Sequence, residues 1–413
     1  MPPDTGYPAR LLRAAVVAMR TLYRTLALPV YVPSIVMAVG QTMSLVMLPL
    51  YAIRLGGHAA QASLVVGAAG VGSLLANVPA GVAVSRFGDR VVMMTALLLG
   101  CAAVLALVLR PGLPMLGGAG FVMGAGFGAW TLGRLSYMTE AVPAAQRGRA
   151  IALMGGTQRL GGFVGPAVGG YLAVAYGFRF AFAAALGCFL LGLALVYRYT
   201  TNHVVHRTLP ERPGLASQWR VLKDYRGVFA TAGVAVFAIA LVRGGYALLI
   251  PLWGTHVGLD AAAIGITFSI LSAIDMLMFY PVGIVMDRYG RKWAGVPCLA
   301  LLGLSLLLLP ATTGFWSLGL LALLFGFGNG LGSGIVMTMG SDLAPLQRRG
   351  EFLGAWRSLA DLGFTGAPVL IGALTIAISL AGASLACGAV GLAGALIMAF
   401  RVRESLVVQP SKS

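Results

Sequence analysis

Charge is scarce in this sequence. Asp, Glu, Lys and Arg make up only 10% of its 413 residues, against roughly 25% in an ordinary soluble domain. Hydrophobic residues account for 59% of the chain, and the mean hydropathy is +0.89. A soluble fold does not need that much apolar surface. The composition therefore excludes an ordinary soluble domain and favours membrane-spanning helices, whose backbone groups are satisfied internally.

Cysteine and histidine are also scarce, with four of each. The cysteines lie far apart in apolar stretches and the histidines lie in loops, a pattern that predicts neither disulfides nor a metal site. A G-x-x-x-x-G-K-[ST] stretch is absent, which argues against an ATP-driven pump. We therefore expect no cofactor, no metal and no enzymatic activity.

Basic residues outnumber acidic ones, 29 to 12, and the formal net charge is +17. Their positions argue against nucleic-acid binding. About 22 of the 29 fall on one side of the predicted spans, about 3 on the other and about 4 inside them, which is the positive-inside pattern. We therefore expect the lipid bilayer as partner, no nucleic acid, and basic loops on the cytoplasmic side.

Apolar runs predict twelve spans, so both termini are expected on the cytoplasmic side. The fold class expected is an all-α membrane protein with twelve transmembrane helices in two pseudo-symmetric six-helix bundles. The spans are predicted near 30–53, 62–84, 91–109, 114–138, 149–174, 180–199, 228–252, 261–283, 293–310, 315–341, 351–375 and 378–400.

Polar segments divide these spans into two equal groups. We expect a cytoplasmic N-terminal segment at 1–29, a six-helix bundle at 30–199, a central cytoplasmic loop at 200–227, a second bundle at 228–400 and a cytoplasmic tail at 401–413.

The two halves repeat at a fixed offset of 202 residues. Composition alone does not explain one offset without gaps, so we predict two six-helix halves in the same orientation, a parallel repeat about the membrane normal. Matching pairs are Pro49 and Pro251, Gly81 and Gly283, Arg86 and Arg288, Gly124 and Gly326, Pro143 and Pro345, and Gly161 and Gly363.

A charged stretch, "GIVMDRYGRK" at 283–292, interrupts the apolar runs, and "GVAVSRFGDR" at 81–90 is its counterpart. The second-half copy matches the loop motif G-x-x-x-D-R-x-G-R-K, so the chain resembles the major facilitator superfamily over nearly its whole length. The first copy departs from the motif, with Ser85 in place of the acid and Asp89 at a position that is usually basic.

The resemblance implies that these loops form a gate at the cytoplasmic helix ends. We expect Asp287 to accept from the N-terminus of the fifth span, Arg288 to reach Asp342, and Arg86 or Arg90 to reach Glu140. The alternative is that the loops only carry positive-inside charge. The predicted gating residues are Gly81, Arg86, Gly88, Arg90, Glu140, Gly283, Asp287, Arg288, Gly290, Arg291, Lys292 and Asp342.

The stretch "GGFVGPAVGG" at 161–170 resembles the fifth-helix signature of the superfamily's drug–proton antiporters, and it implies export. Its alternative reading is an ordinary small-residue packing face with a proline bend. The fourth-helix arginine of those antiporters is missing, because Gly120 stands near its place. The predicted residues of this fifth-helix motif are Arg159, Gly161, Gly165, Pro166, Gly169 and Gly170.

Six ionisable residues fall inside predicted spans, where charge is costly and usually faces a cavity or a partner. Arg357 and Asp361 are four residues apart and can pair on one helix face, either as a structural ion pair or as a proton-sensitive switch. Asp275 is the first candidate for proton coupling, and a salt bridge to an arginine of another helix is its alternative. We assign Asp275, Asp361 and Arg357 to proton coupling.

Arginine dominates this buried set. Arg134 and Arg159 either pair across the halves with Asp275 and Asp361 or face an anion or water. Spans one, four, seven and ten line the cavity in this superfamily, so the residues expected to contact substrate are Gln41, Arg134, Arg243, Trp130 and Tyr246.

The resemblance and the buried charges together predict a secondary transporter that works by alternating access. We expect proton-coupled export of a small organic anion, zwitterion or amphiphile by a monomer in the bacterial inner membrane. The alternatives are an uncoupled or importing organic-anion transporter, and a transporter-like scaffold or sensor that moves nothing.

Overall fold

The computed structural model describes residues 26–109, 112–202 and 215–404. These residues form helices joined by short turns, and no strand occurs among them. Most of the predicted N-terminal segment, most of the C-terminal tail and part of the central loop lie outside the described residues.

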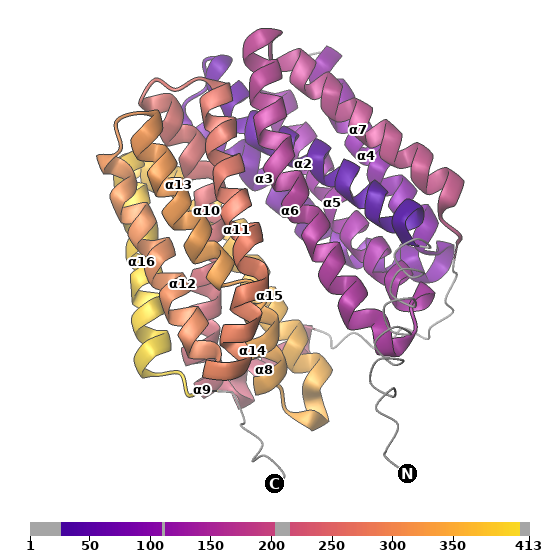
Figure 1. Ribbon diagram of the computed structural model, residues 1–413, viewed down its shortest axis with the longest axis vertical. Coiled ribbons are helices and arrows are strands. Elements are labelled where there is room, and N and C mark those ends of the chain that lie inside the picture. The colour runs from indigo at the N-terminus through magenta and orange to yellow at the C-terminus, as the bar shows by residue number, and fades with distance from the viewer. Residues whose placement is uncertain (1–25, 110–111, 203–214, 405–413) are drawn as a thin grey trace, which may run out of the picture.

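The first bundle holds six long helices, coloured indigo to magenta in Figure 1. A π-helical turn at Ala27–Tyr31 leads into the first of them. The helices are α2 (Val32–Arg54), α3 (Ala59–Phe87), α4 (Asp89–Leu109), α5 (Leu113–Ala141), α6 (Ala144–Ala175) and α7 (Phe178–Tyr199).

The second bundle repeats this plan after the short helices α8 (Leu215–Asp224) and α9 (Arg226–Val228). A π-helical turn at Phe229–Gly233 again precedes its first long helix. The tenth crossing consists of two helices, which meet at Gly334, where φ is +80°. The helices are α10 (Val234–His256), α11 (Ala261–Tyr289), α12 (Arg291–Leu308), α13 (Phe315–Leu331), α14 (Ile335–Leu343), α15 (Arg349–Ala377) and α16 (Leu380–Phe400).

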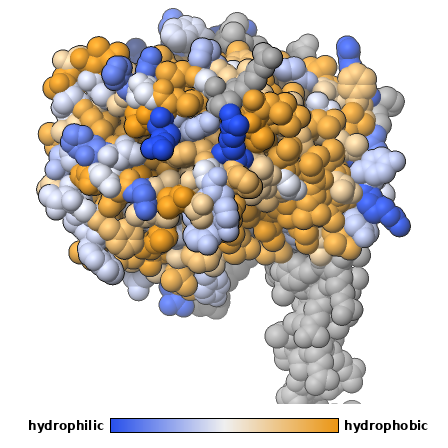
Figure 2. All heavy atoms as spheres, turned by 90° about the horizontal axis from the view of Figure 1, so that it is seen from above, coloured by the Kyte–Doolittle hydropathy of each residue, from blue (hydrophilic) through white to orange (hydrophobic). Residues whose placement is uncertain are grey.

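The described chain therefore crosses twelve times, and the predicted fold class is confirmed. Eleven of the described helical segments are long and apolar enough to span a bilayer. The remaining one, α6, has 32 residues but carries Arg147, Arg149 and Arg159. In the end-on view of Figure 2, hydrophobic residues are mixed with hydrophilic ones. Helices of this length and hydropathy suit a protein surrounded by lipid.

Close helix packing repeats in both bundles and depends on glycine. A Cβ atom on Gly124 of α5 would lie 1.8 Å from the carbonyl oxygen of Ala69 in α3. A Cβ atom on Gly326 of α13 would lie 2.6 Å from the carbonyl oxygen of Leu271 in α11. The same glycine thus brings the same pair of helices together in each half, as expected for membrane helices that pack through small residues.

We call the end of the molecule with the turns at Gly88 and Gly290 the motif end, and the opposite end the far end. Both turn glycines have φ in the left-handed region, +90° and +107°, where a side chain would be strained. In Figure 1 the two bundles meet toward the far end, at the top, and diverge toward the motif end, at the bottom.

Contacts between the bundles begin at the far end and run to the middle of the molecule. Along α6 and α11, a Cβ atom on Gly170 would lie 2.2 Å from the carbonyl oxygen of Ala261, and one on Gly265 would lie 2.2 Å from that of Pro166. Ser269 Oγ donates to the carbonyl oxygen of Phe163 at 2.5 Å. The helices α3 and α15 also meet across the bundles.

Gly124→Ala should destabilise the first bundle, because the added methyl group would overlap the backbone of α3. We expect the free energy of unfolding to fall by roughly 3 kcal/mol or more, with a lower thermal unfolding midpoint in detergent. Gly118→Ala in the same helix is the control, since no atom lies within 4 Å of its added Cβ. Equal midpoints for the two variants would contradict this packing.

Candidate functional site

A cavity of about 660 Å³ lies between the two bundles. Its walls come from α2, α3, α5 and α6 of the first bundle and from α10, α11, α15 and the α13–α14 break of the second. Most of the lining is apolar, with a limited set of polar side chains, as in ligand sites generally. The polar lining residues are Gln41, Thr42, Ser73, Asn77, Thr131, Gln158, Arg243, Arg357, Asp361 and Thr365.

Two predicted substrate residues, Gln41 and Arg243, line this cavity. Gln158 Nε2 donates to Gln41 Oε1 at 3.2 Å. Arg243 Nη2 donates to the carbonyl oxygen of Asn329 at 3.0 Å, while its buried Nε has no hydrogen-bond partner. The seventh crossing therefore presents the Arg243 guanidinium to the cavity, and one of its N–H donors, on Nε, has no partner among the described residues.

The other three predicted substrate residues do not line the cavity. Trp130 is fully buried in the first bundle. Tyr246 is buried and stacks on Phe325 of α13 with ring centroids 3.7 Å apart. Arg134 lies one turn beyond the lining residue Thr131 and is buried. Their substrate contact stays a prediction, because the sequence placed these residues on a lining helix without fixing which face, or which length of it, meets the cavity.

An ion pair joins the two bundles at mid-depth. Arg159 Nε of α6 lies 2.9 Å from Asp275 Oδ2 of α11, and both side chains are largely buried. Arg159 Nη2 donates to Ser333 Oγ at 2.7 Å, and its guanidinium lies 4.6 Å from the centroid of the Phe279 ring. This pair is the salt-bridge alternative for Asp275, and it is also the cross-half pairing foreseen for Arg159.

Asn329 connects this ion pair to the cavity. Its Nδ2 donates to Asp275 Oδ1 at 3.1 Å, and its carbonyl oxygen accepts from Arg243. A change at Arg243 therefore reaches Asp275 through a single residue. The sequence analysis missed Asn329 and Ser333, because neutral polar residues in a membrane span carry no strong signal of their own.

Arg134 is the buried arginine left without a carboxylate. Its Nε and Nη1 are buried and have no hydrogen-bond partner among the described residues. The sequence left two alternatives for Arg134, a pair with Asp275 or Asp361 of the other half, or contact with an anion or water. The pair with a carboxylate of the other half is not observed among the described residues.

The pair on α15 differs from the one at the bundle interface. Arg357 Nε lies 2.9 Å from Asp361 Oδ1, but the Arg357 side chain is 62% exposed and both residues line the cavity. Because solvent screens such a pair, it contributes little to stability. Its charges are accessible to a ligand.

The glycines of the fifth-helix motif form two packing faces on α6. Cβ atoms on Gly161, Gly165 and Gly169 would lie 2.3 to 2.5 Å from atoms of α2, and Thr42 Oγ1 donates to the carbonyl oxygen of Gly161 at 2.7 Å. Pro166 and Gly170 meet α11 instead. The motif thus lets α6 pack closely on its own bundle and on the other one, which brings Arg159 to Asp275.

Arg291 is the centre of the second motif loop. Its Nε lies 2.9 Å from Asp342 Oδ2, and its Nη1 donates to the carbonyl oxygen of Met286 at 2.7 Å and reaches Asp287 Oδ1 at 3.4 Å. The prediction that Arg288 pairs with Asp342 was wrong, because the turn at Gly290 directs Arg291 back along α11. Asp287 is exposed and contacts Arg291 of its own loop rather than the fifth span.

In the first loop, Arg90 also takes a partner other than the predicted Glu140. Its Nη2 donates to the carbonyl oxygen of Tyr197, and its guanidinium lies 5.3 Å from the centroid of that ring. Arg86 is exposed at the end of α3, and Gly81 and Gly283 lie within α3 and α11 at matching positions.

A polar residue after the last helix of each bundle caps the helix that follows the motif glycine. Asn202 Oδ1 accepts from the backbone N–H of Arg90 at 3.2 Å. Glu404 accepts from the backbone N–H groups of Arg291 and Lys292 at 2.8 and 3.0 Å. Asn202 and Glu404 were missed, although they are themselves 202 positions apart.

Comparison with known proteins points to one family. The Major Facilitator Superfamily model matches residues 31–274 and 232–413. A Na(+), Li(+), K(+)/H(+) antiporter of Planococcus maritimus is 26% identical over 332 residues, which cover 72% of this chain and 78% of the antiporter. The uncharacterized MFS-type transporter YfkF of Bacillus subtilis is 32% identical over 124 residues, covering 30% of this chain and 32% of that protein.

Solved structures share the fold. A POT family transporter in complex with a thioalcohol conjugated peptide superposes with a TM-score of 0.74 at 14% identity, covering 91% of this chain and 95% of that one. A D-xylose-proton symporter superposes with a TM-score of 0.71 at 16% identity, covering 93% and 99%.

The pair between Arg159 and Asp275 should show strong energetic coupling. Arg159→Gln or Asp275→Asn alone leaves one buried partner uncompensated, and we expect each to lower the free energy of unfolding by about 3 kcal/mol. The double variant should lose much less than the sum of the two. Thermal unfolding in detergent measures all three variants. The exposed pair of Arg348 and Asp224 is the control, for which little coupling is expected; additive losses at Arg159 and Asp275 would contradict the pairing.

Proposed function

Because the chain belongs to the Major Facilitator Superfamily and is an integral membrane secondary transporter, we propose that it exports a small organic anion or zwitterion in exchange for protons. Transport proceeds by alternating access, in which the two bundles rock about the central cavity. The motif end faces the cytoplasm, since it carries most of the basic residues. In the present arrangement the bundles meet at the far end, so the cavity is reached from the cytoplasm.

The ion pair between Arg159 and Asp275 carries this proposal. A buried carboxylate stays ionised only while a cation or hydrogen-bond donors compensate it. Here Asp275 has one of each, the Arg159 guanidinium and the Asn329 amide. When the partner is withdrawn, Asp275 takes up a proton. The pair therefore links the protonation of Asp275 to the contact between the bundles.

Asn329 supplies the link from substrate to proton. An anion bound at Arg243 draws that guanidinium toward the cavity and away from the carbonyl oxygen of Asn329. Asn329 then moves relative to Asp275, and the pair with Arg159 weakens. The bundles separate at the far end, Asp275 is protonated from that side, and the proton leaves toward the cytoplasm when the pair forms again.

The charges of the cavity support an anionic or zwitterionic substrate. Two arginines, Arg243 and Arg357, face one carboxylate, Asp361, among the residues that line it. Amide groups of Gln41, Gln158 and Asn77 add hydrogen-bonding capacity without charge. A substrate with a carboxylate, or with a carboxylate and an ammonium group, matches this arrangement.

Monovalent cation–proton antiport is a second candidate, favoured by the relative from Planococcus maritimus, which is named for that activity. The ion would need oxygen ligands, and Asp361 is the carboxylate that the described cavity offers. Its pairing with Arg357 makes this candidate the weaker of the two.

Asp275→Asn should abolish proton coupling. In liposomes with a trapped pH dye and an imposed proton gradient, we expect the proton flux driven by organic anions or zwitterions to fall at least about tenfold, because the amide cannot carry the proton. Asp224→Asn, at an exposed carboxylate on α8, should behave as the unaltered protein. Unchanged flux in Asp275→Asn would remove this residue from the mechanism. Flux driven by Na⁺ or K⁺ but by no organic compound would favour the second candidate.

Arg243→Gln should weaken an anionic substrate more than its uncharged analogue. Loss of a charge-assisted hydrogen bond is expected to cost the anion about 2 kcal/mol, roughly thirtyfold in affinity, and the analogue little. Competition binding to purified protein measures both affinities. Equal losses for the two compounds would assign Arg243 to packing instead.

A further inference from the structure

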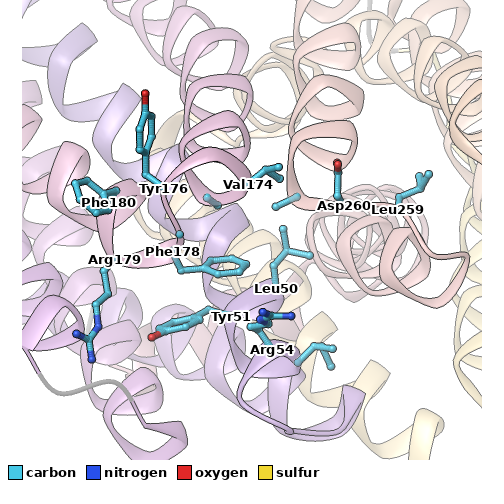
Figure 3. A pocket seen from close by; sticks show the side chains of 14 residues that line it. Leu50, Tyr51, Arg54, Val174, Tyr176, Phe178, Arg179, Phe180, Leu259 and Asp260 are labelled. Atoms are coloured by element: carbon cyan, nitrogen blue, oxygen red, sulfur yellow. The ribbon is translucent and has the colours of Figure 1, made fainter.

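A second hollow lies at the far end, outside the central cavity. This far-end groove measures about 670 Å³ and is shown in Figure 3. Its walls are the last turn of α2, the turn between α6 and α7, and the turn between α10 and α11.

Two arginines from distant parts of the chain line this groove. Arg54 ends α2 and Arg179 lies in the first turn of α7, and both are exposed. Among the described residues neither guanidinium makes a hydrogen bond or an ion pair. Basic residues are otherwise depleted on this side of the membrane, where about 3 of the 29 fall. Two of these few thus line one groove with their charges available.

The wall beside the arginines is apolar and faces outward. Val174 is 53% exposed, Tyr176 60% and Phe180 59%. Tyr51 forms the floor by stacking on Phe178, with ring centroids 4.9 Å apart. Aromatic side chains at helix ends are typical of the depth at which lipid headgroups meet the hydrocarbon. The groove therefore presents cations and an apolar wall at the same level of the bilayer.

Asp260 is the acidic residue of the groove. Its Oδ1 accepts from the backbone N–H of Ala263 at 2.8 Å and so caps α11. In Figure 3 Arg54 and Arg179 flank the Tyr51 side chain on opposite sides, and Asp260 lies on the other wall of the groove, away from Tyr51. The two guanidinium groups thus outnumber one carboxylate that is already engaged, which leaves the Tyr51 side complementary to an anion.

We propose that the far-end groove binds an anionic membrane phospholipid. Its anionic headgroup lies at the level of Arg54 and Arg179, whose charges attract it, and an acyl chain lies along Val174, Tyr176 and Phe180. The occupant is a lipid rather than a soluble anion, because the apolar wall continues outward from the two charges.

The residues that contact the lipid all belong to the first bundle, and Leu259, Asp260 and Ala261 of the second bundle form the opposite wall of the groove. This role is separate from the substrate and coupling ion proposed above.

Native mass spectrometry of the full chain in neutral detergent tests the proposal. The protein is titrated with dioleoyl phosphatidylglycerol and, separately, with dioleoyl phosphatidylcholine. We expect Arg54→Gln/Arg179→Gln to lose about thirtyfold in affinity for phosphatidylglycerol, since each basic residue near an anionic headgroup contributes about fivefold. Arg401→Gln, an exposed arginine at the motif end, is the matched control and should bind as the unaltered protein does.

Two further measurements distinguish a bound lipid from a soluble anion. Glycerol 3-phosphate, the headgroup chemistry without acyl chains, should not displace the lipid, and phosphatidylglycerol should raise the thermal unfolding midpoint of the unaltered protein more than that of the double variant. The proposal is overturned if the double variant binds phosphatidylglycerol within about threefold of the unaltered protein, if phosphatidylcholine binds equally well, or if glycerol 3-phosphate displaces the lipid.

Discussion

The ion pair between Arg159 and Asp275 constrains the whole molecule, because each of its charges would be costly alone inside a membrane. Arg159 belongs to the first bundle and Asp275 to the second, so each bundle supplies the counter-charge for a buried group of the other. The contact between the bundles at this point therefore depends on the charge of the Asp275 carboxyl group. Asn329 and Ser333 satisfy the remaining hydrogen bonds, as a buried pair requires if it is not to destabilise the fold. The nearby cavity residue Arg243 shares Asn329 with this pair.

Helix packing makes that pair possible. Small residues on α6 let it lie between α2 and α11, and the contacts from Gly170 to Phe163 align the two helices until Arg159 reaches Asp275. The repeat explains why both bundles have the same shape, with Gly124 and Gly326 at the same close approach. It does not extend to the charges. The position that matches Arg159 holds Asp361, and the position that matches Asp275 holds Ser73, so the repeat does not supply a second Arg–Asp pair at these places. This asymmetry is where coupling can arise.

Much of this architecture could be predicted from the sequence, because apolar length, positive-inside charge and a fixed offset are properties of the chain itself. The six charges inside the spans could be identified in the same way, since ionisable residues stand out in apolar spans. Their partners could not be fixed, because spacing along one helix does not say which face meets a helix more than a hundred residues away. For the same reason the sequence could not show that Trp130 and Tyr246 lie outside the cavity lining. Asn202 and Glu404 could have been identified from the sequence, since the repeat offset of 202 residues relates them.

The most direct test of this account is the distance between the bundles at the motif end. Spin labels at Pro143 and Leu346, which lie in matching turns before α6 and α15, can be measured by double electron–electron resonance in lipid nanodiscs. The account predicts a single long distance in the unaltered protein, and a shorter distance that becomes populated in Asp275→Asn, as the bundles close at this end. The same distance distribution in the variant and in the unaltered protein would contradict the claim that this ion pair holds the bundles in place.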